Sequence, residues 1–177
     1  EWIGELLERA KFNSESNVSV CILDQGINQG HPLLSPVLKE TDMHTIFADE
    51  IKADISKDGH GTAMAGIATY YNLEKILESQ EEIEVKHILE SVRMLDLNQP
   101  HLEELYGAIT AEAILLPEIE NPNHKRAICM AITSSDSDVI KDGRPSSWSG
   151  ALDSLAAGRY ESEETDRRLI LVSAGNT

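Results

Sequence analysis

Three short segments of the chain place polar, chemically active side chains at the boundaries of expected strands and helices. Asp24 directly follows the apolar run 18–23, His60 stands at the start of a helix-like segment, and Asn176 follows the apolar run 169–174. Carboxyl and imidazole groups are the usual acids and bases of enzymes, and amides donate hydrogen bonds. The three segments therefore raise the hypothesis of an acid–base site.

Each segment also has a simple structural explanation. An Asp after a strand is most often a turn former or cap, a His at a helix start is more often structural, and Gly175-Asn176 alone is a turn signal. Their occurrence in this order, each at an element boundary, makes independent coincidence hard to sustain.

The elements that must position these residues alternate between strands and helices. Short apolar runs indicate strands covered on both faces, and three- and four-residue spacing indicates amphipathic helices. The alternation predicts an α/β fold with a three-layer arrangement, a mostly parallel sheet with helices on both faces. Strands are expected at 18–23, 43–47, 88–95, 127–132 and 169–174, and helices at 2–12, 61–77, 101–116 and 148–157. In such sheets, functional groups gather beyond the carboxyl ends of the strands.

Local signals predict where some of these elements end. Pro117 is expected to help end the third helix, Ser146 or Ser147 to cap the fourth, and Gly158 to close it. The acidic segment 78–84 is interpreted as a surface excursion and 159–168 as a charged insertion.

Size and composition restrict the class of protein. The 177 residues suit a single domain, and the apolar fraction of 41% with 26% charged residues is ordinary for a soluble globular protein. A net charge of −16 argues against nucleic acid or an anionic membrane as partner. A solvated acidic surface explains this charge most simply, and a preference for basic peptides is the alternative.

The two cysteines and the start of the chain bear on its compartment. Cys21 and Cys129 lie in apolar strand-like runs, which predicts buried free thiols and favours a cytoplasmic location. No signal peptide is visible at the start, although a trimmed start leaves secretion open.

The residues around the three segments resemble a known family. Val-Cys-Ile-Leu-Asp-Gln-Gly-Ile followed by His31-Pro32, Asp-Gly-His-Gly-Thr-Ala-Met-Ala-Gly-Ile, and Val-Ser-Ala-Gly-Asn resemble the Asp, His and oxyanion segments of the subtilisin-like serine proteases. The resemblance implies that Asp24 orients His60, that His60 is the general base for a serine, and that Asn176 donates to the oxyanion.

The nucleophile that this resemblance requires is missing. The family carries its serine in a later Gly-Thr-Ser segment, and Ser147, Ser149 and Ser173 lack that context. We therefore expect residues 1–177 to be the truncated N-terminal portion of one peptidase domain, inactive alone, whose complete protein is a serine endopeptidase.

Several positions depart from the family pattern. Gln25 replaces a usual Ser or Thr, and Leu33 stands where many relatives place an acidic calcium ligand. We expect no metal and no cofactor. Ala131, Ile132 and Thr133 fall where relatives pair with substrate backbone, and the bulk of Thr133 predicts a small or unusual residue before the scissile bond.

Two rival hypotheses remain open. An inactive relative could serve as a binding or scaffold module, and an unrelated nucleotide-binding α/β domain would need a phosphate-binding glycine loop that is absent. We expect a protein or peptide as substrate, neither nucleic acid nor membrane as partner, and leave open additional domains or a regulatory partner.

Overall fold

A five-stranded parallel sheet forms the centre of the computed structural model, which describes residues 2–132, 145–160, 163–164 and 166–174. Its strand order is β3-β5-β2-β6-β9, and every neighbouring pair is parallel. The strands are β2 (Val18–Asp24), β3 (Met43–Thr45), β5 (Ile88–Arg93), β6 (Lys125–Met130) and β9 (Leu169–Val172). Strand β2 lies at the middle, where the chain order along the sheet reverses, so its carboxyl end is the natural position for a site.

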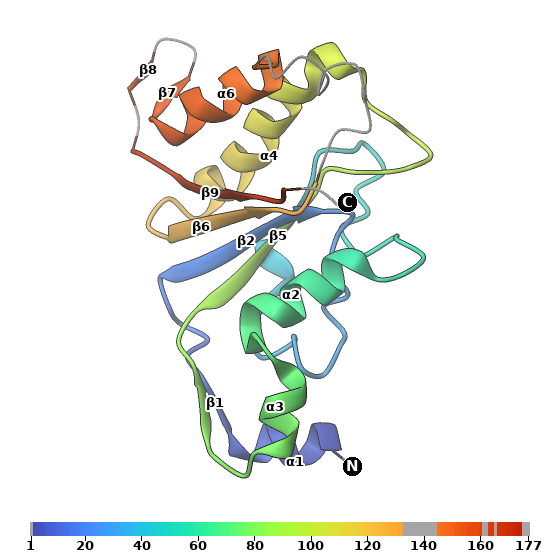
Figure 1. Ribbon diagram of the computed structural model, residues 1–177, viewed down its shortest axis with the longest axis vertical. Helices are drawn as coiled ribbons and strands as arrows, with labels where there is room; N and C mark the ends of the chain where they lie inside the picture. Colours follow the sequence, from blue (N-terminus) through green and yellow to red (C-terminus); the bar gives the residue numbers. More distant parts are fainter. Residues whose placement is uncertain (1, 133–144, 161–162, 165, 175–177) are drawn as a thin grey trace.

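Helices cover both faces of this sheet (Figure 1). Helices α2 (His60–Tyr70) and α3 (Leu73–Glu78) lie on one side, and α4 (Tyr106–Glu120) and α6 (Ser147–Ala156) lie on the other. Because side chains alternate along a strand, Ile22 packs into the core beside α2 whereas Leu23 packs into the core beside α4 and α6. The predicted three-layer α/β fold is confirmed.

The N-terminal segment differs from its prediction. The helix expected over 2–12 ends earlier, as α1 (Trp2–Arg9), and β1 (Ala10–Phe12) follows it. Strand β1 pairs in parallel with β4 (Ile83–Val85), which lies largely in the acidic segment interpreted as a surface excursion. Val85 is buried and Phe12 and Ile83 pack against the same core, so burial of these side chains favours the strand pair.

The helix expected over 61–77 is two helices. Helix α2 ends before Tyr71, whose φ is +57°, and the side chain of Asn72 caps α3 by accepting from the Lys75 N–H at 3.0 Å. A capping Asn starts a new helix more readily than it continues an old one.

Helix α4 continues past Pro117, where we expected it to end. A short 3-10 turn (Glu103–Leu105) precedes it, and Pro117 is buried inside its last turns. The Pro117 carbonyl accepts from the Asn121 N–H at 2.9 Å and from the Arg126 guanidinium at 2.5 Å. The helix end is thus satisfied by its own cap residue Asn121 and by Arg126 of β6.

The end signals of α6 are confirmed. Ser146 is the cap, accepting from the Ser149 N–H at 3.1 Å, and Gly158 has a φ of +71°. The expected charged insertion contains a short antiparallel pair, β7 (Arg159–Tyr160) and β8 (Glu163–Glu164). Among the described residues, no helix has the length and apolarity that a bilayer span requires.

Candidate active site

Asp24 and His60 meet at the carboxyl end of β2. Asp24 is the last residue of that strand, His60 is the first residue of α2, and Asp24 Oδ2 lies 2.7 Å from His60 Nδ1. The Asp24 side chain is only 2% exposed, whereas the His60 side chain is 43% exposed. A buried carboxylate therefore holds one ring nitrogen, which leaves His60 Nε2 for a reacting group.

Two opposing effects act on the ionisation of Asp24. Burial raises the pKa of the Asp24 carboxyl, while the Gln25 N–H and the neighbouring His60 act in the opposite direction. The Gln25 N–H donates to Asp24 Oδ1 at 2.8 Å. Because each carboxylate oxygen then has one partner, the carboxyl plane and the facing imidazole are fixed together.

Two glycines allow α2 to start beside β2. Gly59 precedes the helix with a φ of +70°, a conformation that L side chains rarely adopt. A Cβ on Gly61 would lie 2.1 Å from the Gly26 carbonyl oxygen and 3.2 Å from Asp24 Cβ. The closeness of these backbones brings the first residue of α2 within reach of Asp24.

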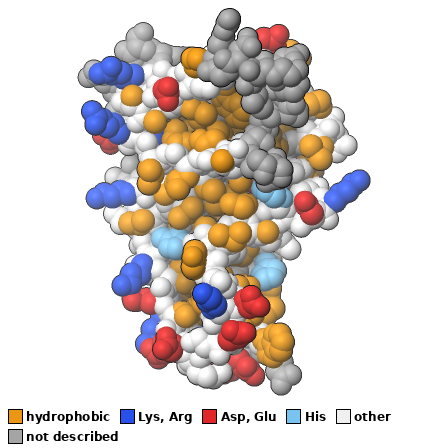
Figure 2. All heavy atoms as spheres, viewed as in Figure 1, with side chains coloured by type: hydrophobic (Ala, Val, Ile, Leu, Met, Phe, Trp, Pro, Cys, Tyr) orange, Lys and Arg blue, Asp and Glu red, His pale blue; other side chains and the backbone are white. Residues whose placement is uncertain are grey.

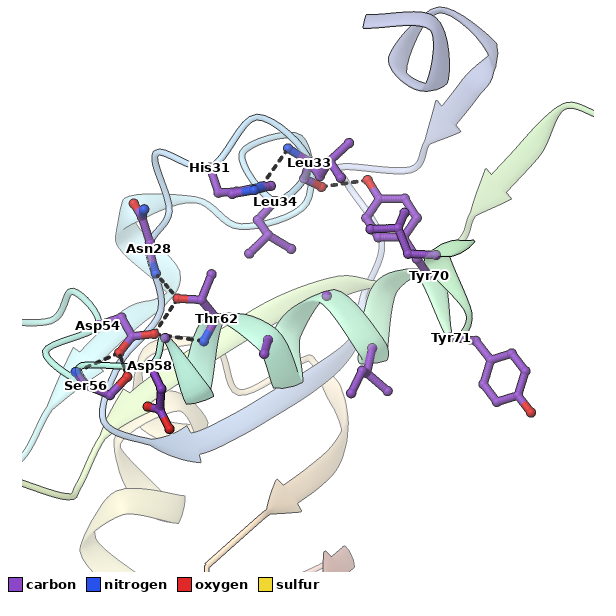
Figure 3. A pocket seen from close by; sticks show the side chains of 15 residues that line it. Asn28, His31, Leu33, Leu34, Asp54, Ser56, Asp58, Thr62, Tyr70 and Tyr71 are labelled. Atoms are coloured by element: carbon purple, nitrogen blue, oxygen red, sulfur yellow. Dashed lines mark hydrogen bonds between the residues drawn. The ribbon is translucent and has the colours of Figure 1, made fainter. Parts of the chain in front are cut away.

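Asp54 stabilises the start of the same helix, a role that the sequence did not indicate. Its carboxylate accepts from the Thr62 N–H at 3.0 Å and from the Ser56 N–H at 2.9 Å, and both hydroxyls also donate to it (Figure 3). Ser56 Oγ in turn accepts from the His60 N–H at 3.0 Å. No sequence pattern predicts this role of Asp54, because the residue reaches the start of α2 across an irregular loop.

Hydrogen bonding determines the charge state of Asp54. Partial burial raises its pKa, but the hydrogen bonds from Ser56 and Thr62 outweigh burial, and the pKa lies below its ordinary value. Thr62 Oγ1 also accepts from the Asn28 N–H at 3.0 Å. Thr62 thus connects the loop after β2, the loop containing Asp54, and the start of α2.

Arg93 fixes the loops on the other side of Asp24. It is paired with Asp24 in the sheet register, is almost fully buried, and its guanidinium lies 2.6 Å from an Asp49 oxygen and 2.9 Å from an Asp96 oxygen. Its guanidinium also lies 4.4 Å from the centre of the Phe47 ring. Arg93 thereby joins the segments after β3 and β5 at the rim of the site.

Two of the predicted substrate-binding residues follow the next strand. Ala131 and Ile132 are half-buried directly after β6. Ile132 lines a cavity of about 240 Å³, together with Met94, Leu95, His101 and Trp148. Thr133 and Asn176 lie outside the described residues.

Within the described part of the chain, no serine hydroxyl forms a hydrogen bond with the His60 ring. The His60 ring has Asp24 as its hydrogen-bond partner there, Ser147 begins α6, and the Ser173 N–H donates to the carbonyl of Met130, the last residue of β6, at 3.1 Å. Among the described residues, Asp24 and His60 thus meet with no serine hydrogen-bonded to the ring.

Metal and thiol chemistry find little support in the described residues. None of their His, Cys, Asp and Glu side chains form a group of three or more that could hold a metal ion, and the expected absence of a metal stays a prediction. Leu33 is buried, and its carbonyl accepts from the Tyr70 hydroxyl at 2.6 Å. Cys21 and Cys129 are free, and burial raises the pKa of both thiols.

We compared the chain with models of protein families and with curated proteins. The model of the subtilase family matches residues 15–177, which include β2, α2 and the whole central sheet. No curated protein matches the chain.

Proposed function

The chain belongs to the subtilase family, and on that premise we propose that the complete protein is a serine endopeptidase that uses Asp24 and His60. The observation that carries this proposal is the 2.7 Å contact between Asp24 Oδ2 and His60 Nδ1 at the carboxyl end of β2. A serine hydroxyl is a weak nucleophile at neutral pH and needs such an oriented base.

In the proposed reaction, His60 Nε2 takes the proton of the serine hydroxyl as its oxygen attacks the peptide carbonyl. Asp24 keeps the other ring nitrogen protonated and stabilises the imidazolium that forms. Asn176 donates its side-chain N–H to the oxyanion of the tetrahedral intermediate. His60 then gives the proton to the leaving amine, and water repeats the sequence to release the acyl group.

The substrate in this proposal is an extended peptide beside β6. Ala131, Ile132 and Thr133 would pair with its backbone by strand addition. The cavity of about 240 Å³ that Ile132 lines could accept one apolar side chain of that peptide.

The proposal places the nucleophile outside residues 1–177, which would be the N-terminal portion of one peptidase domain. The edge strand β9 supports this, since Leu169 is 62% exposed and Leu171 and Val172 are each 50% exposed. Hydrophobic side chains gather in the middle of the face shown in Figure 2, which is the face that β9 occupies in Figure 1. An open apolar edge of this kind suits further chain packing against it.

A fluorophosphonate probe applied to the complete protein tests this function. We expect labelling of a serine beyond Thr177, loss of labelling in His60→Ala, and turnover reduced by about 10⁴-fold in Asp24→Asn. Absence of labelling in a folded complete protein would favour the alternative, an inactive binding or scaffold module.

A further inference from the structure

Two segments far apart in the sequence fold together at the end of the molecule that holds the N-terminus (Figure 1). Strands β1 and β4 pair through Ala10 with Ile83 and Phe12 with Val85. We call residues 2–12 and 73–85 the N-terminal unit. Its first segment precedes the part of the chain that the family model matches, 15–177.

A groove of about 1020 Å³ lies in this unit between α1 and α3. Its apolar lining comes from both helices, with Trp2 and Leu6 on α1 and Leu73 and Leu77 on α3. Leu6 is fully buried at its base, but Trp2 is 71% exposed. An indole this exposed beside leucines is a large apolar surface that a partner could remove from water.

Four carboxylates line the same groove. Glu5 and Glu8 come from α1, and Glu74 and Glu78 come from α3. None of the four has an ion pair with another described residue. Acidic side chains also gather at this end of the molecule in Figure 2.

The basic side chains of the unit do not neutralise this groove fully. The Arg9 guanidinium donates to the Ile76 and Glu81 carbonyls, and Lys11 Nζ lies 2.5 Å from a Glu82 oxygen. Residues 2–12 and 73–85 together hold seven Glu against three Lys or Arg residues. The groove thus combines an apolar base with a negative rim.

We propose that this groove binds a basic amphipathic helix of a partner protein, at a site separate from the peptide-cleaving cleft. Apolar side chains of such a helix would cover Trp2 and Leu77, while its flanking Lys or Arg side chains reach the carboxylates on either side. A second copy of this chain is a poor occupant, because its net charge of −16 opposes the negative rim.

Titration of the chain with a model helix tests the proposal. The probe is a peptide of about 16 residues made of Leu and Lys, with Leu at helical spacing. We expect saturable binding that moves the indole N–H signal of Trp2 in a ¹H–¹⁵N spectrum and leaves that of Trp148, which donates to Thr110 Oγ1. Binding should weaken with added salt and be lost when Glu replaces Lys in the peptide.

A matched pair of charge variants locates the site. The double variant Glu74→Gln with Glu78→Gln should weaken binding by about tenfold, because two ion pairs at the rim are lost. The double variant Glu112→Gln with Glu120→Gln, which makes the same charge change on the exposed surface of α4, should leave binding unchanged.

Three outcomes would overturn the proposal: no saturable binding, equal binding of the Glu peptide, or spectral changes that centre on His60 instead of Trp2. Circular dichroism of each variant establishes that it is folded. Because no step of this test requires a nucleophile, its failure would leave the proposed peptidase function intact.

Discussion

In the proposed mechanism, the buried carboxyl group of Asp24 orients His60 and must be ionised to stabilise the imidazolium. Burial raises the pKa of Asp24 above the ordinary value of 3.8. The carboxylate is therefore less favoured in the folded state than in the unfolded state, so the stability contributed by this group falls as pH rises from its unfolded pKa through its folded pKa.

Asp24→Asn should remove this dependence, since the amide does not ionise. We expect the free energy of unfolding of the variant, relative to the parent chain, to increase between about pH 4 and about pH 7. Urea denaturation at both pH values measures this difference in the free energy of unfolding. Asp58→Asn, which changes an exposed carboxyl group, is the control. A relative stability that decreases over this range would contradict the account.

Asp54 has the opposite pH signature. Its pKa is lowered in the folded state, with hydrogen bonds from Ser56 and Thr62 outweighing burial. The stability that it contributes is therefore present above its unfolded pKa and is lost as pH falls through its folded pKa.

Loss of the Asp54 carboxylate leaves the Thr62 N–H, in the first turn of α2, without its acceptor. We expect Asp54→Ala to lower the free energy of unfolding by about 1–2 kcal/mol at neutral pH, the usual cost of losing a helix cap, and the deficit to shrink in acid. Asp58→Ala in the same loop should have little effect. Equal losses in both variants would show that Asp54 does not act through the helix start.

At the scale of elements, the junction of α2 with β2 depends on the absence of a side chain at Gly61. Gly61→Ala would place a Cβ 2.1 Å from the Gly26 carbonyl oxygen, so the backbones must separate. We expect a loss of about 1–3 kcal/mol in the free energy of unfolding, as for other overpacked sites.

Gly66 supplies the control on the same helix. A Cβ there meets nothing within 4 Å, so Gly66→Ala should be neutral or stabilise by up to about 1 kcal/mol through helix propensity. Thermal unfolding of the two variants side by side measures the difference. Similar effects of both changes would mean that the helix start tolerates displacement.

The elements that sequence patterns predicted are those whose own residues contain the signal. Strand β2 has a short apolar run, β5 is buried at every position, and Ser146 caps α6 with its own hydroxyl. The pairing of β1 with β4 and the Arg126 contacts beyond Pro117 were missed, because their partners lie far away in the sequence.

The same distinction applies to the site. The sequence indicated Asp24 and His60 because each lies in a compact motif at an element boundary. The structure places their side chains in contact, and their catalytic role stays a prediction. Asp54 and Arg93 were not found, because only the folded loops bring them to the helix start and to Asp49. The residues that position a site come from distant parts of the chain, whereas its candidate catalytic residues lie in short motifs that can be recognised in the sequence.

At the scale of the whole molecule, β9 is an edge strand of the central sheet among the described residues. Strand β9 pairs with β6 on one side, and Leu171 is 50% exposed on it. Exposed apolar edge strands favour association with other strands.

We therefore expect the 177-residue chain to self-associate with rising concentration and Leu171→Lys to reduce that association. Sedimentation velocity measures it. Ile119→Lys, which changes a side chain 72% exposed on α4, is the matched control and should leave association unchanged. A monomeric parent chain, or equal effects of both variants, would contradict the interpretation of this edge.

The contact between Asp24 and His60 is the claim on which the mechanism depends, and ¹⁵N-histidine NMR of the chain tests it most directly. For the neutral ring, we expect the proton of His60 to lie on Nδ1, facing Asp24, and Asp24→Asn to shift that signal. A His60 ring protonated on Nε2, or one indifferent to Asp24→Asn, would contradict the account.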